Sequence, residues 1–378
     1  MLRRLVKPLC LLAFSFFALG CPHRSPVWSP DGARIVVLAG KSGEEVDKAA
    51  SQIWLVDVAG GKAQAVKGPA ADLRYLAAAW ADNGSFVVAT GKWENDSIAD
   101  DSERIWLVQG DGTGWKNLEL PHPNAERVTR RPLVVAGQGK ERKLIYPSGN
   151  EAVVAVSLES LKEAFKAEPA ELVGLGPKGG FIIFRPEPEN TGTNELVAFG
   201  GDLKILWRLK FSRLRDGIAK KLGKQPTDIV FNDTSTSHLP FKEDEPWVGV
   251  TLIFSDVGWK DGIPAYYVRL DAGSGEVLTA LRGVGLSGRP ASAGGLAWAV
   301  LAPDPKAGLP VRLQSIQLDD GKVRATAALE NVGKEAVHGY AFNPSGKQFA
   351  VSLNGPVPAL RIYSEGNLEK ARVIELGK

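Results

Sequence analysis

The side chains that most often perform catalysis in enzymes are few in this sequence and lie far apart. The four histidines are His23, His122, His238 and His338. No Gly-x-Ser-x-Gly nucleophile elbow occurs, and although His238 follows a run of Ser and Thr, the members of a catalytic triad usually come from separate segments. We therefore predict no catalytic residue. The sequence favours a protein that is not an enzyme, without excluding one.

Two segments match the Gly-x-Gly-x-x-Gly pattern of dinucleotide-binding loops. They span residues 174–179 and 283–288. In a binding loop the last glycine opens a helix whose N-terminus holds the phosphates. Here the first segment runs into the apolar stretch Phe181–Phe184 and the second into Arg289-Pro290. Both segments are therefore predicted to be turns between strands, and we expect no cofactor.

One loop, Glu94–Glu103, carries enough oxygen ligands to suggest calcium. Its acidic residues are Glu94, Asp96, Asp100, Asp101 and Glu103. Calcium-binding loops place a glycine at their centre, and this spacing has none. No cluster of Cys and His has the spacing of a zinc site. A solvated acidic loop is the favoured interpretation, and we expect no metal.

Ten tryptophans are many for this length. Four of them recur at equivalent positions of a repeat described below and are predicted to lie in the core: Trp28, Trp54, Trp80 and Trp106. Three others have turn-like neighbours: Trp93, Trp115 and Trp259. If these three were exposed on one face, their rings would form a platform for a saccharide or a peptide.

The N-terminus has the pattern of an export signal. Basic residues Arg3, Arg4 and Lys7 precede an apolar stretch from Leu9 to Leu19, which is too short to span a bilayer. The following Ala18-Leu19-Gly20-Cys21 resembles the bacterial lipobox. That resemblance implies cleavage after residue 20 and a lipid anchor on Cys21. A plain secretory signal cut elsewhere is the alternative.

Cysteine usage agrees with that interpretation, because Cys10, the other cysteine, lies in the segment to be removed. Residues 1–20 would be the signal peptide and 21–25 a lipidated tether. Pro22 is not the aspartate that retains lipoproteins in the inner membrane, which favours the outer membrane. We expect a periplasmic or outer-membrane-anchored lipoprotein with no internal disulfide.

Charge excludes one large class of partner. The formal net charge is +3, but removing residues 1–20 leaves 43 basic and 43 acidic residues. Nucleic-acid binding requires a basic stripe, so we expect no nucleic acid. The 42 glycines and 24 prolines indicate many turns.

A repeat of 52 residues organises the chain. Turn motifs occur at Trp28–Gly32 and Trp80–Gly84, where Pro, Asp or Asn set the turn and Gly supplies a positive φ. Related motifs lie at 342–346, which is six intervals from the first, and at 294–300. The similar Ile145–Gly149 lies off the period and suggests an insertion in the third repeat.

A second motif keeps the same period. Ile53–Asp57 and Ile105–Val108 are apolar strands that start 52 residues apart, each followed by a glycine turn. Related strands lie at 267–271, 316–319 and 361–363. Each is predicted to be the third strand of a four-stranded unit, and 276–278 to be a fourth strand.

Such units bury both faces only by packing around a ring. We therefore predict an all-β fold, a single β-propeller of about seven four-stranded blades over residues 26–378. At these motifs the chain resembles the TolB-type, WD-like propeller family, well in 25–120 and 335–376 and weakly in 120–280. TolB proper has an α/β domain before its propeller, and we expect none before the first blade here.

Two helical insertions are predicted from spacing. Leu158, Leu161 and Phe165 suggest one near 158–172. Leu214, Ile218 and Leu222 suggest another near 213–224, stopped by Gly223 and Pro226.

A rigid ring that presents loops suits binding to another protein. The favoured function is a non-catalytic binding scaffold, a monomer that meets an envelope protein and touches the membrane through Cys21. One alternative is a propeller enzyme, or an enzyme-associated propeller, acting on glycans or peptides, and another is a sensor of a small ligand or a metal. Carboxylates converging in one funnel would favour the enzyme.

Overall fold

The structure is a computed structural model of the 378-residue chain. It describes residues 25–40, 50–95, 97–130, 133–149, 151–188, 190–231, 233–239, 246–253, 265–283, 291–293, 296–301, 312–317, 319, 322–329, 337–353, 357–364 and 367–377. The predicted signal peptide and most of the tether, including Cys21, lie outside the described residues.

The strands form seven antiparallel sheets, six of four strands and one of five, each built from consecutive strands. The first blade contains β1 (Val27–Trp28), β2 (Arg34–Ala39), β3 (Gln52–Asp57) and β4 (Lys62–Val66). The second contains β5 (Leu73–Asp82), β6 (Ser85–Glu94), β7 (Ser97–Ile98), β8 (Arg104–Gln109) and β9 (Lys116–Asn117). The third contains β10 (Val134–Ala136), β11 (Lys143–Ser148), β12 (Ala152–Ser157) and β13 (Glu163–Ala167).

The fourth blade contains β14 (Glu171–Gly176), β15 (Gly180–Glu187), β16 (Asn190–Phe199) and β17 (Ile205–Lys210). The fifth contains β18 (Asp233–His238), β19 (Trp247–Ile253), β20 (Ala265–Asp271) and β21 (Val277–Gly283). The sixth contains β22 (Ala291–Ala293), β23 (Leu296–Leu301), β24 (Arg312–Gln317) and β25 (Val323–Ala328). The seventh contains β26 (Val337–Phe342), β27 (Gln348–Leu353), β28 (Ala359–Ser364) and β29 (Asn367–Glu375).

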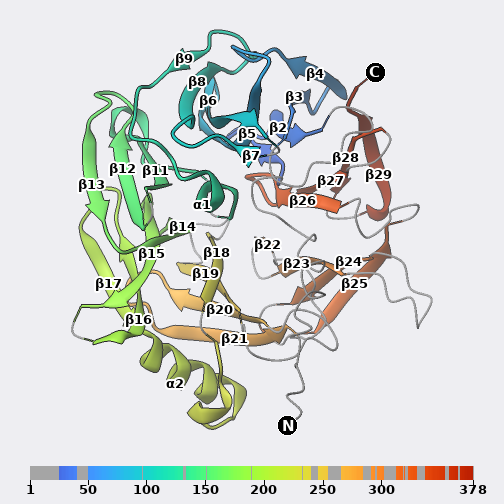
Figure 1. The fold of residues 1–378 in the computed structure, drawn as a ribbon. Coiled ribbons are helices and arrows are strands. Elements are labelled where there is room, and N and C mark those ends of the chain that lie inside the picture. The colour runs from blue at the N-terminus through green and yellow to red at the C-terminus, as the bar shows by residue number, and fades with distance from the viewer. Residues whose placement is uncertain are drawn as a thin grey trace, which may run out of the picture.

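The sheets stand around a common centre, with the first strand of each blade innermost and the last at the rim (Figure 1). This arrangement confirms the predicted all-β propeller and its number of blades. The strands predicted as third in their blades are β3, β8, β20, β24 and β28, and all five occupy that position.

The motif that lies off the period needs a different explanation from an insertion. Gly32 and Gly84 lie in the turn between the first and second strands of their blades. The equivalent turn of the third blade contains Gly137, which has a φ of 84°. Gly137 lies close to the position that the 52-residue repeat predicts from Gly32 and Gly84. Ile145–Gly149 leads into the next turn, between β11 and β12. The motif therefore marks a different turn from the one in the first two blades, namely the turn between the second and third strands. The insertion that we inferred from it is wrong.

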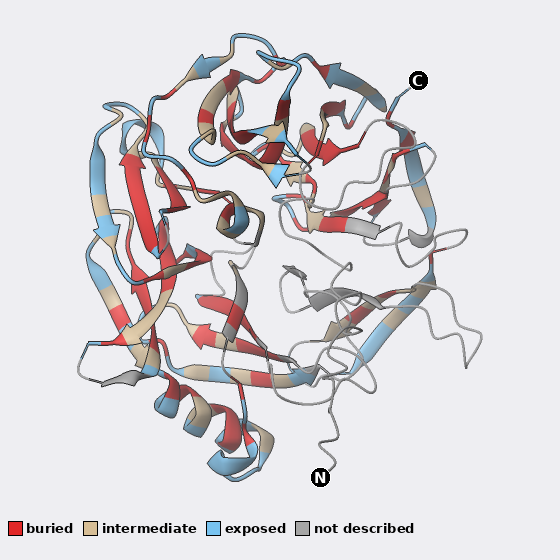
Figure 2. Ribbon diagram, viewed as in Figure 1, coloured by how far each residue is buried: buried red, intermediate tan, exposed pale blue. Residues whose placement is uncertain are grey.

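The core lies between the blades rather than within one of them. Side chains of a strand alternate between its two faces, so Val36 and Leu38 of β2 pack toward the second blade. Ile35 and Val37 of the same strand pack with Leu360 and Ile362 of the seventh. Figure 2 shows the resulting pattern, with buried residues along the inner strands and exposed ones on the rim strands.

Both predicted helices fall on described residues, and the structure contains one of them. α2 (Phe211–Leu222) ends at Gly223, which has the left-handed conformation of a helix C-cap. The segment 158–172 is not helical: it forms the turn before β13, then β13 and the start of β14. Phe165 lies on β13 and packs against Phe181 and Phe199 at ring distances of 5.5 and 4.8 Å. Packing on the next blade thus overrides the helical spacing.

A second, short helix, α1 (Ala125–Arg130), was not predicted and lies in the connection from the second to the third blade. Two 3₁₀ turns, η2 (Gly139–Glu141) and η3 (Pro226–Asp228), complete the helical elements of the described chain. Within that described part, no helix is long and apolar enough to cross a membrane.

Candidate interaction face

The two faces of the ring differ because of how antiparallel strands are connected. In each blade the turns between strands one and two, and three and four, meet at one face. We call it the short-turn face. The turns between strands two and three, and the connections to the next blade, meet at the other, which we call the long-connection face. The latter carries residues 95–103 and 118–133, the second of which includes α1.

On the short-turn face, neighbouring blades are joined by hydrogen bonds. The Arg34 guanidinium donates to the backbone oxygens of Asn83 and Gly110 in the second blade. Arg142 of the third blade pairs with Asp82 of the second. Lys143 Nζ donates to the Gly201 oxygen of the fourth blade at 2.8 Å. These bonds occupy the backbone groups that a partner would otherwise use.

The sequence motifs build this face locally. The Ser29 hydroxyl donates to Asp31 Oδ1 at 2.6 Å and accepts from Arg34 N at 2.9 Å. The hydrogen bond from Ser29, followed by that from the Ala33 amide, lowers the pKa of Asp31. The Asp31 amide in turn donates to Asn83 Oδ1 of the second blade at 3.0 Å. The turn motif therefore contributes to the joint between the first and second blades.

On the long-connection face, α1 is bonded to the third blade and to the connection that follows it, and lies toward the centre of the ring (Figure 1). Asn124 Oδ1 accepts from the Arg127 amide at 2.9 Å and caps the helix. The Arg127 guanidinium donates to the backbone oxygens of Ala152 and Ala170, in the third blade and in the connection to the fourth. The buried Tyr146 hydroxyl donates to the Pro121 oxygen at 3.1 Å, and burial raises its pKa.

A polar group lies beside α1. The Arg104 guanidinium donates to the backbone oxygens of Asp101 and Glu103 at 2.8 and 2.7 Å. It also lies 3.3 Å from His122 Nε2, and His122 Nδ1 is 3.9 Å from Asp101 Oδ1. Asp101 is 95% exposed and His122 44%. A pair this exposed and this long is worth little in binding energy and lacks the buried environment of a catalytic base.

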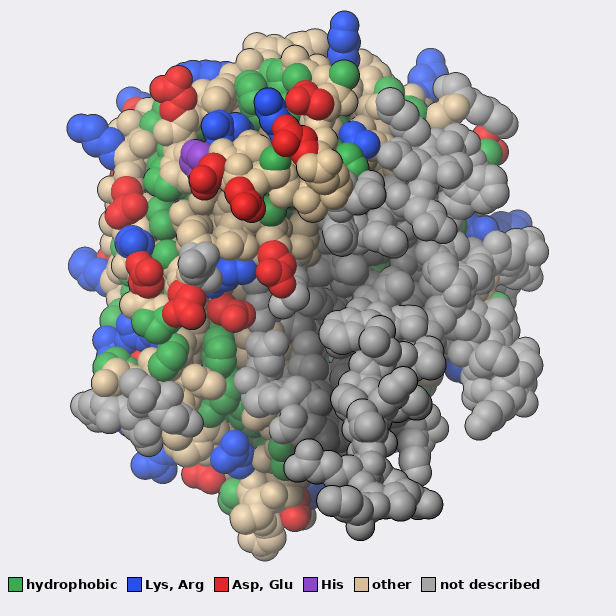
Figure 3. All heavy atoms as spheres, in the orientation of Figure 1, with side chains coloured by type: hydrophobic (Ala, Val, Ile, Leu, Met, Phe, Trp, Pro, Cys, Tyr) green, Lys and Arg blue, Asp and Glu red, His purple; other side chains and the backbone are tan. Residues whose placement is uncertain are grey.

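Charge on this face is predominantly acidic over the second and third blades, among the side chains that the structure describes. Exposed acidic residues of the connections and adjoining strand ends there are Asp72, Glu94, Asp100, Asp101, Glu119, Glu126, Glu151 and Glu168, against the exposed bases Lys67, Lys92 and Lys166, of which Lys166 pairs with Glu168 at 2.7 Å. Figure 3 shows acidic side chains spread over the described part of the face in view.

The acidic loop behaves as a surface loop. Ser97 and Ile98 fold back as β7 on the end of β6, and Ser102 Oγ accepts from the Lys92 amide at 2.9 Å. Among the described residues, no three of His, Cys, Asp and Glu lie close enough together to hold a metal ion. Asp96 lies outside the described residues.

The predicted tryptophan platform is not assembled on the described chain. Trp93 is half-buried, with Arg74 over its ring at 5.6 Å, and packs in the core between the second and third blades. Trp115 packs against Trp106 and Tyr75 at ring distances of 6.1 and 6.2 Å, on the opposite side of the second blade. Trp259 lies outside the described residues.

The tryptophans predicted to be core are buried with one exception. Trp28, Trp54 and Trp80 are 7%, 9% and 6% exposed. Trp106 is half-buried, and its Nε1 donates to Thr90 Oγ1 at 2.9 Å. The first glycine-rich segment is the turn between β14 and β15, as predicted. The second lies almost entirely outside the described residues.

Comparison with known proteins finds resemblance in structure alone. No protein-family model matches the chain, and no curated protein matches it. A chain of the structure titled "Crystal Structure of Mitotic Checkpoint Complex" aligns over 100% of this chain and 97% of its own, with a TM-score of 0.52 and 8% identity. The C-terminal WD40 domain of Sif2 aligns over 95% and 87%, with a TM-score of 0.49 and 11% identity. The first of these alignments agrees with the β-propeller fold that the sheets of this chain form.

Proposed function

We propose that this protein is a non-catalytic binding scaffold whose long-connection face, over the second and third blades, docks a protein partner. The observation that carries the proposal is the difference between the two faces. On the short-turn face, Arg34, Arg142 and Lys143 join neighbouring blades. The long-connection face presents α1 and the loop 95–103, with exposed charges.

The rigidity of the platform supports a binding role. α1 is tied through Arg127 to two further segments of the ring, and Tyr146 holds the connection that precedes it. A surface that is already ordered loses little conformational entropy when a partner binds. A neighbour of this fold is a chain of the mitotic checkpoint complex, an assembly of proteins, which agrees with this proposal.

We further propose that the protein is exported and anchored by a lipid on Cys21. The basic start, the short apolar stretch and Ala18-Leu19-Gly20-Cys21 support this, as does the resemblance of the turn motifs to TolB-type propellers. The partner would then be an envelope protein, met by a monomeric propeller at the periplasmic side of a membrane.

The docking face is tested by charge reversal and crosslinking in envelope fractions. The variant Asp100→Lys/Asp101→Lys changes two exposed positions of the loop. The matched control, Glu141→Lys/Glu159→Lys, makes the same charge change on the short-turn face at side chains 84% and 54% exposed. We expect the first variant to lose its crosslinked partner and the control to keep it. Equal capture by both variants would contradict the docking face.

The anchor is tested separately. Cys21→Ala removes the thiol that lipidation requires, so the variant is expected to leave the membrane fraction. Unchanged partition between membrane and soluble fractions would refute the anchor and leave the docking face standing.

A further inference from the structure

The segment around α2 concentrates positive charge in a chain that is otherwise balanced. Residues 203–224 contain eight basic residues and one acidic residue, Asp216. After residue 20 the whole chain carries basic and acidic residues in equal number. A local excess of this size produces a positive potential at the surface even when the net charge is near zero.

Some of these cations are used by the fold. Lys204 pairs with Asp202 at 3.1 Å, and Lys210 pairs with the buried Glu187 at 2.9 Å, where β17 passes into α2. The Arg215 guanidinium lies 5.6 Å from the ring centre of Phe231. The remaining five are exposed and make no salt bridge with any described residue: Arg208, Arg213, Lys220, Lys221 and Lys224.

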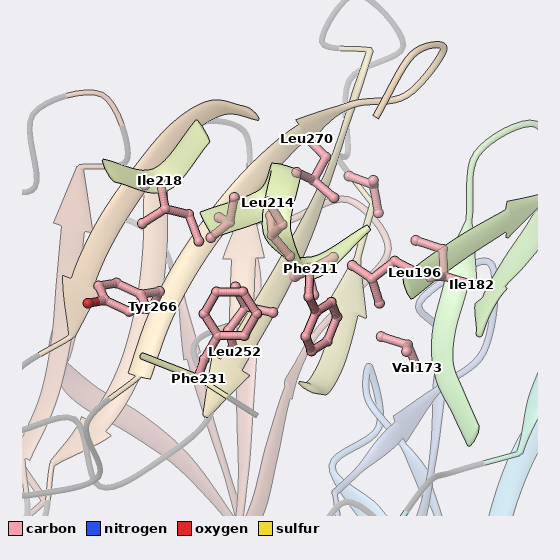
Figure 4. Close-up of a cluster of buried hydrophobic side chains, with 14 of the residues drawn as sticks. Val173, Ile182, Leu196, Phe211, Leu214, Ile218, Phe231, Leu252, Tyr266 and Leu270 are labelled. Atoms are coloured by element: carbon pink, nitrogen blue, oxygen red, sulfur yellow. The ribbon is translucent and has the colours of Figure 1, made fainter. Parts of the chain in front are cut away.

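The apolar side of α2 is already occupied. Phe211, Leu214 and Ile218 are buried in the core between the fourth and fifth blades, and Figure 4 shows these side chains pointing into that core with Phe231 and Leu252. The helix therefore cannot insert an apolar face into another molecule without unfolding the blades. Any contact made by its outer side is ionic.

Helix stability does not explain all of the positive charge. Lys220 and Lys221 lie in the last turn, where cations interact favourably with the helix dipole. Arg213 lies in the first turn, which has no acidic residue, and there a cation opposes the dipole. Arg213 and Lys220 are seven residues apart, two turns of helix, and so lie on one side of α2. The exposed Asp216 lies on that side between them, so cations outnumber the single carboxylate there without replacing it.

We propose that the outer side of α2, formed by Arg213, Lys220, Lys221 and Lys224, docks on an anionic phospholipid surface. Figure 1 shows α2 outside the rim of the ring, as a projection that a flat surface can reach. A helix of 12 residues is about 18 Å long. Its outer side falls well short of the ~800 Å² per partner that a stable protein interface buries. Electrostatic attraction to a membrane needs no such area.

The test measures sedimentation of the full chain with lipid vesicles, made of phosphatidylcholine alone or mixed with phosphatidylglycerol. The test variant is Arg213→Glu/Lys220→Glu/Lys221→Glu. The matched control is Lys62→Glu/Lys116→Glu/Lys162→Glu, which makes the same charge change at exposed lysines of other blades. Each protein is measured both as the full chain and as residues 22–378, which lack the signal segment and Cys21, and the comparison is made on the shorter chains, so that binding by the N-terminal segment cannot mask a difference.

The wild type and the control are expected to bind the phosphatidylglycerol vesicles. The test variant is expected to bind them at least about 100-fold more weakly, since each basic residue near an anionic surface contributes about 1 kcal/mol. Binding by the wild type should fall in about 1 M salt, where the Debye length is about 3 Å. Equal binding by the wild type and the test variant would overturn the proposal. So would a test variant that loses an acidic protein in crosslinking while it binds vesicles unchanged.

Discussion

The indole N–H of Trp28, on the first strand, donates a hydrogen bond to the backbone oxygen of Ala341, on the first strand of the seventh blade, at 3.2 Å. The two residues are 313 positions apart in the sequence. The Arg372 guanidinium adds bonds to the backbone oxygens of Val58 and Ala59 across the same joint. The first and last blades are thus joined by side chains, and each keeps all four of its own strands.

The hydrogen bond from Trp28 to Ala341 should contribute measurably to the free energy of unfolding. Trp28→Phe keeps an aromatic ring and leaves the Ala341 oxygen without its donor, so we expect a loss of about 1–2 kcal/mol in the free energy of unfolding. Trp54→Phe is the control, because the buried Trp54 Nε1 has no hydrogen-bond partner among the described residues. Urea denaturation compares the two. Equal losses would show that the Trp28 bond contributes nothing.

The ion pair between the second and third blades predicts a pH dependence. Burial alone would raise the pKa of Asp82, but hydrogen bonds from Arg142, Ser85 and Gly84 outweigh it and lower the pKa below its ordinary value of 3.8. The carboxylate therefore adds stability above that value, and its contribution is lost as the pH falls through the lowered pKa.

We expect Asp82→Asn to destabilise the protein at neutral pH by less than about 1 kcal/mol, since the pair is partly exposed. The difference from the wild type should shrink below about pH 4. Urea denaturation at a series of pH values measures it, and a difference that grows on acidification would contradict the assigned direction of the pKa.

The attachment of α1 predicts that its backbone amides are protected from hydrogen exchange. Arg127→Met removes the donors to the Ala152 and Ala170 oxygens, so amide hydrogen exchange should speed up over residues 124–130. Arg208→Met is the control, because Arg208 is an exposed side chain of β17, in another blade from α1, and makes no salt bridge with any described residue. Exchange monitored by mass spectrometry separates the two effects. If Arg127→Met leaves exchange in α1 unchanged, the guanidinium does not hold the helix.

Because the fourth and fifth blades approach closely at Gly174, we predict that adding a side chain there destabilises the protein. Gly174 has a φ of 150°, and a Cβ there would lie 2.6 Å from Ser237 Oγ and 3.2 Å from its amide nitrogen. We expect Gly174→Ala to cost about 2–3 kcal/mol, from strain and the clash together. Gly149→Ala is the control: its φ is 55° and nothing lies within 4 Å, so only strain of about 1–2 kcal/mol is expected. Thermal denaturation that ranks Gly149→Ala as the worse variant would contradict this.

The repeat predicted the ring because two motifs keep one period and each corresponds to a fixed strand. Trp28 and Trp80 lie at or near the end of the first strands of their blades, and Trp54 lies on a third strand. Errors arose where a local pattern had two physical interpretations. Residues 158–172 have helical spacing, but Leu161 lies in a turn with a φ of 57°, and Phe165 is held by rings of the next blade.

The sequence predicted the fold better than it predicted the interaction face. The acidic residues of 94–103 were visible, but nothing nearby in the sequence shows that His122 would meet Arg104. α1 has only six residues, and its placement depends on Arg127 reaching oxygens 25 and 43 positions away. Contacts of this kind are set by which blades become neighbours.

The joint between the first and seventh blades has a consequence during synthesis. The apolar side of the first blade that carries Ile35 and Val37 is covered by residues from Ala350 to Leu376. A ribosome adds about 5–20 residues per second, so this side is exposed to solvent for tens of seconds before its cover exists. Over that interval the nascent chain exposes apolar strand surface that chaperones and other copies of the chain can bind. Slower translation would lengthen that exposure, and the aggregation of newly made chains should increase with it.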